Sequence, residues 1–388
     1  MFYRKMPNMD EELSILGFGM MRLPIIDNDT SQIDEKKATE LVRYAIDNGL
    51  NYLDTAYPYH GKGFSGAGAS EPFTAKVLKD GYREKVKIAT KLPSWLIKSR
   101  EDMDRILNEQ LDRLETDSID FYLIHALNKD HWANLTSLGV KDFMDKALED
   151  GKIKYAGFSF HDGRVEVFKN IVDDYHWSFC QIQYNYLDEE YQAGKEGLDY
   201  AAEKGLGIIV MEPLRGGGLV NNLPEAASKI FLESDENRTK AEWALRWIWN
   251  HKDVSLILSG MSTMDQVIEN VKIAGDAEID SMNKEELDTI DKVKTILKEK
   301  IKVDCTSCSY CMPCPTGVDI PANFTRFNEY HIFNSEEARK STKELYFRFL
   351  SEEKQAVSCI ECGECESHCP QNIPIPEKLK LVTETLSI

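Results

Sequence analysis

The strongest constraint on the fold is a repeat of short apolar segments, each followed by a polar turn and an amphipathic stretch. Apolar residues in the amphipathic stretches recur at helical spacing, as in EKKATELVRYAIDNG and MDQVIENVKIA. Eight strands alternating with helices over roughly 260 residues are the count and length of a (β/α)8, or TIM, barrel of the α/β class. The predicted strands are residues 14–19, 51–56, 86–92, 119–125, 153–159, 179–185, 207–213 and 254–260.

An open, doubly wound sheet is the alternative arrangement for alternating strands and helices. Such a sheet would carry a Gly-rich GxGxxG turn after its first strand. This chain has LGFGMMRLP at that place instead. The sequence therefore favours the closed barrel, which we expect to occupy residues 1–281.

The charge and the first residues of the chain limit its partners. A formal net charge of −19 over 388 residues argues against nucleic acid, because phosphate binding needs a basic face. The opening MFYRKMPNMDEELS lacks the apolar core of a signal peptide, and no run reaches the roughly 18 apolar residues of a membrane span. We therefore expect a cytoplasmic protein that acts on small molecules and does not associate with membranes.

Polar residues at strand ends are the candidate catalytic groups, because the chemistry of such barrels lies at the carboxyl ends of the strands. Asp54, Lys91 and His125 end three predicted strands, and the loop after Asp54 adds Tyr57 and Tyr59. A charged side chain at the end of a buried strand must be paired or desolvated. Desolvation costs free energy, so a charged residue at such a place often has a function. Each residue alone also has an ordinary interpretation, as a helix cap, a solvated lysine or a structural histidine.

Together, these side chains form a plausible proton-transfer group. A tyrosine with an ordinary pKa near 10 exchanges protons poorly at neutral pH. A nearby ammonium lowers that pKa, a carboxylate holds the ammonium in place, and an imidazole helps to polarise a substrate oxygen. The combination therefore points to acid–base chemistry on an oxygen atom of a substrate.

Four of these residues, Asp54, Tyr59, Lys91 and His125, resemble in order and spacing the catalytic tetrad of the aldo-keto reductases. The resemblance covers roughly residues 1–280, and the opening segment resembles the hairpin that closes the bottom of that family's barrel. It implies hydride transfer from a reduced nicotinamide to a carbonyl carbon, while Tyr59 protonates the oxygen. Lys91, held by Asp54, would lower the pKa of Tyr59, and His125 would orient the carbonyl. Tyr57 is interpreted as a pocket or packing residue.

The same resemblance implies a nicotinamide dinucleotide site. Ser159 and Gln181 correspond to residues that hold the carboxamide, the segment EPLRGGGL to the loop around the pyrophosphate, and SGMSTMDQVIEN to the adenosine end. The glycines and the charge of Arg215 suit a phosphate-binding loop. The implied cofactor-binding residues are Ser159, Gln181, Glu212, Leu214, Arg215, Gly216, Gly260, Ser262, Gln266, Glu269 and Asn270.

Some residues depart from the family pattern. Phe160 stands where an Asn is common, and Met211 where an aromatic ring commonly stacks on the nicotinamide. Gly260 and Gln266 stand where Lys and Arg commonly bind the 2′-phosphate of NADPH. The choice between NADH and NADPH therefore stays open, and FMN at the barrel mouth is a further alternative.

Eight of the nine cysteines fall in the last 84 residues, in two runs that each end in Cys-Pro. A disulfide framework is typical of small secreted domains, so a metal site is the better interpretation. Zinc needs only four ligands in CxxC pairs, whereas triplets at x2 spacing with a fourth cysteine suit two 4Fe-4S clusters with crossed ligands. The predicted sets are Cys305, Cys308, Cys311 and Cys369 for one cluster, and Cys359, Cys362, Cys365 and Cys314 for the other. In the first run, two residues separate the third and fourth cysteines, where three residues are usual.

The segment between the two cysteine runs has helical periodicity and separates them by 45 residues. It resembles the helical ferredoxins that act as electron-relay modules. We expect a linker helix over residues 282–300 and a ferredoxin-like domain over residues 301–388. The ninth cysteine, Cys180, lies inside a predicted strand and is interpreted as a small buried apolar residue.

Barrel and cysteine segment together resemble the iron-sulfur branch of the aldo-keto reductase superfamily, as in MEPLRGG, GFSFHD and CSYCMPCPTGVDIP. This implies an oxidoreductase that reduces a carbonyl or conjugated carbonyl compound. A nicotinamide transfers two electrons and a cluster one, so the halves need an intermediary. Three roles stay open: structural clusters, a flavin between the two halves, or docking of an external electron carrier such as a ferredoxin. A non-catalytic redox sensor or electron carrier is the alternative to an enzyme.

Overall fold

The computed structural model of the chain describes residues 1–27, 29–62, 65–234, 236–305, 307, 311–333, 335–369 and 371–387. These residues divide into two compact units. The first unit contains Met1–Tyr184, Gln192–Pro213 and Arg246–Ser281, and the second contains Asn185–Tyr191, Leu214–Leu245 and Met282–Ile388. The predicted boundaries after residues 281 and 300 stay predictions.

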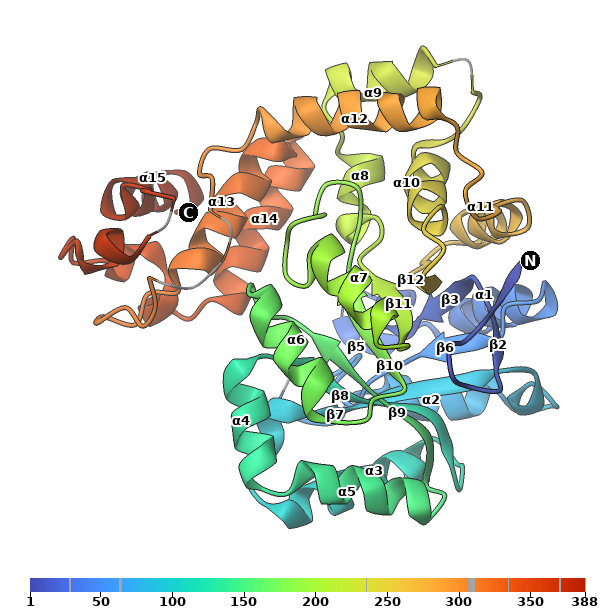
Figure 1. The fold of residues 1–388 in the computed structure, drawn as a ribbon. Coiled ribbons are helices and arrows are strands. Elements are labelled where there is room, and N and C mark those ends of the chain that lie inside the picture. The colour runs from blue at the N-terminus through green and yellow to red at the C-terminus, as the bar shows by residue number, and fades with distance from the viewer. Residues whose placement is uncertain are drawn as a thin grey trace. The chain divides into compact units, whose positions relative to one another are not determined.

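A closed, parallel, eight-stranded barrel forms the centre of the first unit (Figure 1). The prediction of a (β/α)8 barrel is confirmed, and the open doubly wound alternative is wrong, because the last barrel strand pairs with the first. Each strand overlaps one of the predicted segments. The strands are β3 (Leu16–Gly19), β6 (Tyr52–Asp54), β7 (Lys87–Pro93), β8 (Ile119–Leu127), β9 (Ile153–Phe160), β10 (Phe179–Gln183), β11 (Gly207–Met211) and β12 (Val254–Ser259).

Helices follow the strands and bury one apolar face each, as their periodicity predicts. Their ends carry the expected signals: the helix at Arg100 begins with a capping box between Ser99 and Asp102. The helices are α1 (Glu35–Asp47), α2 (Ser70–Val77), α3 (Arg100–Arg113), α4 (Lys129–Ser137), α5 (Val140–Glu149), α6 (Val165–Asp174), α7 (Gly194–Glu203), α10 (Lys240–Trp249) and α11 (Met264–Ala274). A short hairpin, β4 (Ile25–Ile26) and β5 (Asp29–Ile33), precedes α1.

An antiparallel hairpin of β1 (Tyr3–Lys5) and β2 (Glu12–Ser14) supplies side chains to the barrel interior. Met6 and Met9 of its turn are buried in one apolar cluster with Phe121 and Phe179 of the barrel strands. This agrees with the prediction that the opening segment closes the bottom of the barrel. Functional side chains are consequently sought at the opposite, carboxyl ends of the strands.

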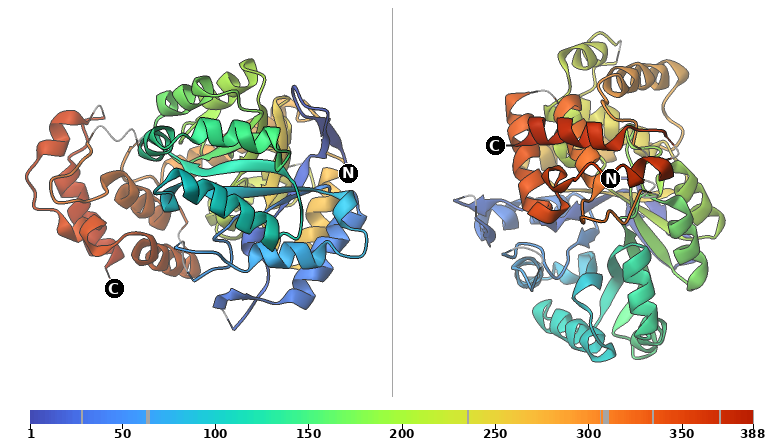
Figure 2. Two further views of the ribbon diagram at one scale, coloured as in Figure 1. Left: turned by 90° about the horizontal axis from the view of Figure 1, so that it is seen from below. Right: turned by 90° about the vertical axis from the view of Figure 1, so that its left-hand side faces the viewer.

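The second unit is mostly helical. Its helices are α8 (Gly218–Asn221), α9 (Glu225–Leu232), α12 (Lys284–Lys298), α13 (Ile320–Ile332), α14 (Glu336–Phe349) and α15 (Ile375–Leu386). The predicted linker helix over residues 282–300 is α12, which packs along α9, and α13 packs against α14 and α15 (Figures 1 and 2). Within the described ranges, no helix is long and apolar enough to cross a membrane.

Candidate active site and cluster-binding cysteines

The Lys91 ammonium connects two other residues of the predicted tetrad. Strands β6 and β7 are neighbours, so the end of β6 lies beside Lys91. Lys91 Nζ donates to Asp54 Oδ1 at 2.6 Å, to the Thr55 carbonyl oxygen at 2.8 Å and to Tyr59 Oη at 3.3 Å. These three acceptors match the three protons of the buried ammonium, so its orientation is fixed.

His125 completes the tetrad from β8. The register of β8 against β9 shifts after Ile124, and Ala126 has a φ of 53°, so the strand bends next to the histidine. The His125 ring lies edge-on to the Tyr59 ring, with centroids 5.9 Å apart, and 5.0 Å from the Trp95 ring. Its Nδ1 is buried and has no hydrogen-bond partner among the described residues. The four predicted catalytic residues therefore lie together in the first unit.

Tyr57 has a different environment from Tyr59. Its hydroxyl donates to Glu109 Oε2 at 2.7 Å, and the Arg113 guanidinium lies 5.7 Å from the centre of its ring. Tyr57 thus contacts residues of α3 rather than Lys91. The side chain is buried, which suits the packing role assigned from the sequence.

The pKa values of the tetrad are set mainly by burial. Burial raises the pKa of Tyr59 above its ordinary value, although Lys91 acts in the opposite direction. Lys91 thus lowers the pKa of Tyr59 as predicted, but desolvation of the hydroxyl outweighs this effect and the net shift is upward. Burial also lowers the pKa of His125 well below its ordinary value, and Lys91 adds to this shift, so the imidazole is neutral at physiological pH.

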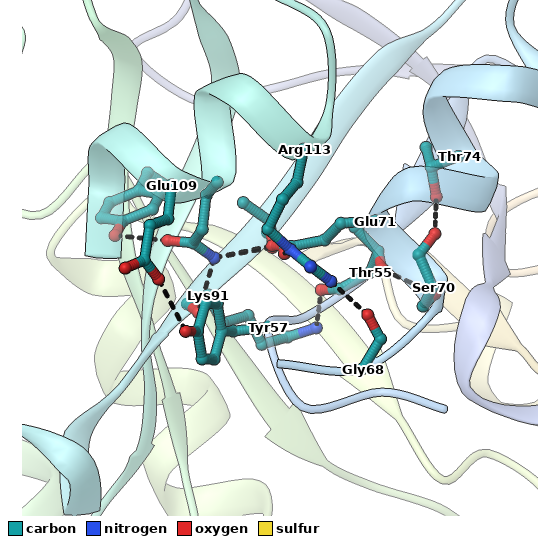
Figure 3. A network of polar contacts seen from close by, with 12 residues as sticks. Thr55, Tyr57, Gly68, Ser70, Glu71, Thr74, Lys91, Glu109 and Arg113 are labelled. Atoms are coloured by element: carbon teal, nitrogen blue, oxygen red, sulfur yellow. Dashed lines mark hydrogen bonds and ion pairs between the residues drawn. The ribbon is translucent and has the colours of Figure 1, made fainter. Parts of the chain in front are cut away.

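A buried polar network behind β7 holds the backbone of this site. Gln110 Nε2 donates to the Lys91 carbonyl oxygen at 3.0 Å and to Glu71 Oε1 at 2.8 Å. Arg113 Nε donates to Glu71 Oε2 at 2.8 Å, and its guanidinium also binds the Gly68 carbonyl oxygen. Figure 3 shows Arg113 reaching toward both Glu71 and Gly68. The network ties the loop after β6 to the strand that carries Lys91, and no pattern in the sequence indicated it.

Two predicted carboxamide-binding residues lie opposite each other on adjacent strands. Ser159 of β9 and Gln181 of β10 are paired in register, and both are buried. Ser159 Oγ accepts a hydrogen bond from the Ala126 backbone N–H at 2.8 Å, which leaves the hydroxyl proton as a donor. Gln181 Oε1 is buried without a hydrogen-bond partner among the described residues. The Ser159 hydroxyl as a donor and Gln181 Oε1 as an open acceptor fit, respectively, the carbonyl and amino groups of a nicotinamide carboxamide.

Two departures from the family pattern have clear structural positions. Phe160 is fully buried, and its ring packs 5.2 Å from that of Phe168, so it is a core residue. Met211 ends β11, where its sulfur accepts a hydrogen bond from Gln181 Nε2 at 3.5 Å. Met211 thus lies beside the candidate carboxamide site but offers a thioether instead of a ring.

The predicted adenosine end follows β12 and continues into α11. Ser262 donates its backbone N–H to Gln266 Oε1 at 2.9 Å, so these two residues bind each other. Asn270 is buried and donates from Nδ2 to Ser259 Oγ at 3.0 Å, whereas Glu269 is half-buried. The roles of these four residues and of Gly260 in cofactor binding stay predictions.

Arg22 is a candidate cofactor contact that sequence reasoning missed. It ends the short 3-10 helix η1 (Met20–Arg22), and its side chain lies across Gly260, where an added Cβ atom would sit 3.0 Å from Arg22 Cδ. Arg22 Nη2 lies 3.5 Å from Glu212 Oε1. The aliphatic part of an arginine from a distant segment thus packs against Gly260, and its guanidinium lies beside Glu212. No sequence pattern relates residues 22 and 260.

Three predicted cofactor residues, Leu214, Arg215 and Gly216, belong to the second unit. They form a tight loop in which Arg215 and Gly216 have φ values of 48° and 62°. Arg215 lies 3.5 Å from Asp188 Oδ2 and 3.6 Å from Glu329 Oε1. The guanidinium that was predicted to bind pyrophosphate is therefore already paired with two carboxylates.

A cavity of about 220 Å³ in the second unit brings cysteines of both runs together. Its lining includes Cys311 and Cys314 of the first run and Cys359, Cys362 and Cys365 of the second. Burial, and then the charges of Cys359, Cys362 and Cys314, raises the pKa of the Cys365 thiol to about 11. Thiolates so close together need positive charge nearby, which the iron of a cluster supplies. Four of these five cysteines form the predicted second ligand set, including its crossed member Cys314, whereas Cys311 belongs to the first set.

The first cysteine of each run has the same local geometry. Cys305 Sγ accepts the backbone N–H of Ser307 at 3.4 Å, and Cys359 Sγ accepts that of Glu361 at 3.4 Å. Ser307 and Glu361 both have a φ of 56°. Such N–H to sulfur bonds stabilise thiolates and tune iron-sulfur clusters. The two runs thus have the same backbone geometry around their first cysteine.

The other predicted ligand set is only partly described. Cys305, Cys311 and Cys369 pack around the small apolar core of the second unit, and Cys308 lies outside the described residues. Within the described ranges, no three His, Cys, Asp or Glu side chains are arranged to hold a single metal ion. A 4Fe-4S cluster binds its four thiolates through four different iron atoms, so its ligands lie farther apart. Cys180 is fully buried in β10, as predicted for an apolar residue.

Comparison with protein-family models gives two matches. Residues 15–295 match the model described as the aldo/keto reductase family. Residues 304–373 match a 4Fe-4S dicluster domain. The second match covers all eight cysteines of the two runs, from Cys305 to Cys369.

Known proteins with similar sequences are oxidoreductases by name. Probable aldo-keto reductase 1 of Glycine max is 30% identical over 233 residues, which are 56% of this chain and 62% of that protein. L-galactose dehydrogenase of Arabidopsis thaliana is 26% identical over 322 residues, 76% of this chain and 94% of that protein. The holo form of aldo-keto reductase AKR11C1 from Bacillus halodurans has a similar structure, with a TM-score of 0.62 and 27% identity over 76% of this chain and 96% of that one.

Proposed function

Because this chain belongs to the aldo/keto reductase family and carries a 4Fe-4S dicluster domain, we propose that it reduces a carbonyl or conjugated carbonyl compound with NAD(P)H. The observation that carries this proposal is the Lys91 ammonium, which bridges the Asp54 carboxylate and the Tyr59 hydroxyl. A buried ion pair is weak evidence for a stabilising role, and buried charged groups held in this way are concentrated at functional sites. The position of Lys91 favours a function in proton transfer.

The bound dinucleotide would supply a hydride to the carbonyl carbon. Ser159 and Gln181 would hold its carboxamide, since one offers a hydroxyl donor and the other a buried open acceptor. Tyr59 then delivers a proton to the oxygen that becomes an alkoxide, which yields the alcohol. Lys91 stabilises the tyrosinate that remains, and Asp54 keeps Lys91 charged and in place.

His125 acts in this proposal as a neutral hydrogen-bond donor to the substrate oxygen. Its ring lies beside that of Tyr59, so both can reach one oxygen atom. Because burial and Lys91 keep its pKa low, it does not compete with Tyr59 as a proton donor. Trp95 packs against the same imidazole and forms an apolar wall beside it.

The eight cysteines of the two runs would hold two 4Fe-4S clusters, which carry one electron at a time when bound. The cavity around Cys314 and the second triplet supports the crossed arrangement for one of them. Two proposals compete for the role of the clusters. They relay electrons to a flavin or an external carrier, or their role is purely structural. No observation on the barrel side favours FMN over a nicotinamide dinucleotide.

Anaerobic purification, followed by iron, sulfide and flavin analysis and titration with NADH and NADPH, tests the proposed function. We expect about eight iron and eight sulfide per chain, no flavin, and saturable binding of at least one dinucleotide. Carbonyl compounds should then be reduced with one equivalent of the dinucleotide. Bound flavin would replace the nicotinamide mechanism by the flavin alternative. Clusters without binding of any of these cofactors would support the non-catalytic electron carrier.

The rate of carbonyl reduction should depend little on pH near neutrality. Tyr59 must be protonated to act as the acid, and burial raises its pKa above the ordinary value, so the protonated form persists at neutral and mildly alkaline pH. His125 stays neutral because its pKa is lowered. We expect kcat to be level from about pH 6 to about pH 9 and to fall above about pH 10. A loss of activity centred between about pH 6 and 7 would contradict this assignment of the two groups.

A further inference from the structure

The backbone of Tyr59 is covered by a later part of its own loop. Ser70 donates its backbone N–H to the Tyr59 carbonyl oxygen at 3.2 Å, and Gly68 donates its N–H to the Tyr57 carbonyl oxygen at 2.8 Å. A Cβ atom added to Gly68 would lie 2.0 Å from the Tyr59 carbonyl oxygen, so only a glycine allows this close approach. The position of Tyr59 therefore depends on where the segment 68–70 is held.

Arg113 of α3 holds that segment from the outside. Its guanidinium binds the Gly68 carbonyl oxygen, and its Nε donates to Glu71 Oε2 at 2.8 Å (Figure 3). The Glu71 side chain is fully buried and that of Arg113 is 23% exposed, so water screens their attraction weakly. Because a guanidinium presents its N–H groups in a rigid, planar fork, one side chain fixes both acceptors relative to each other.

The same helix also holds Lys91, the partner of Tyr59. Gln110 lies three residues before Arg113, on the same face of α3, and its Nε2 donates to the Lys91 carbonyl oxygen at 3.0 Å. Gln110 Oε1 accepts from Tyr122 Oη at 2.8 Å, so the orientation of this buried amide is fixed. The distance of 3.3 Å between Lys91 Nζ and Tyr59 Oη thus depends on two groups that α3 holds.

We propose that Arg113 is a positioning residue for Tyr59, because it fixes the segment 68–70 and so keeps the Tyr59 hydroxyl beside Lys91. This rests on the proposed function, in which Tyr59 delivers the proton. Arg113 contacts Glu71, Gly68 and the ring of Tyr57, so it acts through the loop and not on the substrate. A displacement of about 1 Å at a reacting group can lower a rate by about 10²-fold, so a contact outside the site can control kcat.

The variant Arg113→Met removes the N–H donors and keeps an unbranched side chain. We expect kcat for carbonyl reduction to fall about tenfold or more. The Kd of the dinucleotide should change less than about twofold, because the proposed carboxamide site lies on β9 and β10.

Arg83→Met is the matched control. Arg83 also binds one carboxylate and one backbone carbonyl group, with Nη2 at 2.9 Å from Asp120 Oδ2 and Nη1 at 3.0 Å from the Val86 oxygen. These contacts lie at the amino end of β7, whereas Lys91 lies toward its carboxyl end. The kcat of Arg83→Met should therefore equal that of the wild type.

A double-mutant cycle separates positioning from a general loss of stability. If Arg113 acts through the Tyr59 hydroxyl, Arg113→Met should lower kcat about tenfold in the wild type but less than about twofold in Tyr59→Phe, where no hydroxyl is left to position. Loss of a contact that only supports the barrel would lower kcat by the same factor in both backgrounds.

Hydrogen exchange provides a readout that needs no substrate. The backbone N–H groups of residues 68–70 donate to carbonyl groups of residues 57–60. They should exchange faster in Arg113→Met than in the wild type or in Arg83→Met. The double variant Glu71→Gln/Arg113→Met leaves no unpaired carboxylate in the interior and should behave in the same way, which keeps the test valid if Arg113→Met folds poorly.

Three results would overturn the inference. Unchanged kcat in both Arg113→Met and Glu71→Gln/Arg113→Met would show that Tyr59 keeps its place without Arg113. Equal losses of kcat in the wild-type and Tyr59→Phe backgrounds would assign Arg113 a purely structural role. Unchanged exchange at residues 68–70 would show that Arg113 does not hold the segment. A wild-type protein that reduces no carbonyl compound would instead contradict the proposed function, while hydrogen exchange would still test the hold of Arg113 on the loop.

Discussion

Replacement of Tyr59 by phenylalanine is expected to lower kcat for carbonyl reduction by about 10³-fold or more, because the hydroxyl bonded to Lys91 is removed. The ring and its contact with His125 remain, so the pocket should keep its shape. Binding of the dinucleotide should change less than about twofold, since Tyr59 holds neither the carboxamide nor the phosphates in the proposed site. Steady-state kinetics and dinucleotide titration of the same preparation measure both quantities.

Tyr57→Phe is a matched control for this variant. Tyr57 lies two residues earlier in the same loop, and its hydroxyl binds Glu109 instead of Lys91. Its loss should leave kcat nearly unchanged and cost a small amount of stability, about 1 kcal/mol for one hydrogen bond. Unchanged turnover in Tyr59→Phe would contradict the tetrad assignment. Equal losses in both variants would indicate a general disturbance of the loop.

Removal of two cysteines at once is expected to separate the crossed from the uncrossed cluster arrangement. In the crossed sets, Cys314 and Cys365 serve one cluster, so Cys314→Ala/Cys365→Ala should retain about four of eight irons. Cys365→Ala/Cys369→Ala should lose both clusters, because in the crossed sets each substitution removes a ligand of a different cluster. The uncrossed arrangement reverses this: the first pair would then disable both clusters. Iron and sulfide analysis, together with EPR of the reduced protein, measures how many clusters each variant retains.

The shared core of the second unit makes a further control necessary, because loss of one cluster can unfold the segment that holds the other. Each single variant, Cys314→Ala, Cys365→Ala and Cys369→Ala, should therefore be reconstituted with iron and sulfide before analysis. Cys180→Ala, in the buried wall of the barrel, should keep all the iron. A first double variant with clearly less iron than its two single variants would contradict crossed ligation by Cys314.

Much of the fold is encoded in local patterns. The eight apolar runs each lie where a barrel strand forms, and the helical period places α1, α11 and α12 close to their predicted bounds. Strand and helix formation depends on side chains a few residues apart, so periodicity and capping residues suffice to locate the elements. The candidate tetrad could be identified for the same reason, because each of its residues lies near the carboxyl end of a strand or in the loop just beyond it.

The pKa values of the site could be predicted less well from the sequence than the positions of its residues. The pattern correctly placed an ammonium near Tyr59, yet it implied a lowered pKa, whereas burial raises the pKa in the absence of ligands. Desolvation depends on everything packed around the hydroxyl, including parts of the chain that carry no motif. The network of Glu71, Gln110 and Arg113 was missed on the same grounds, since its members are ordinary residues of α2 and α3.

The sequence by itself determined the barrel, the four candidate residues of the tetrad and the presence of cysteine runs with cluster spacing, because these features depend on short-range order along the chain. Only the tertiary structure decided that Arg22 lies across Gly260 and that Glu329 lies beside Arg215. Each of these contacts joins segments far apart in the chain. These contacts form because the apolar faces of the elements pack against one another, and the local periodicity of the sequence does not indicate which distant segments will meet.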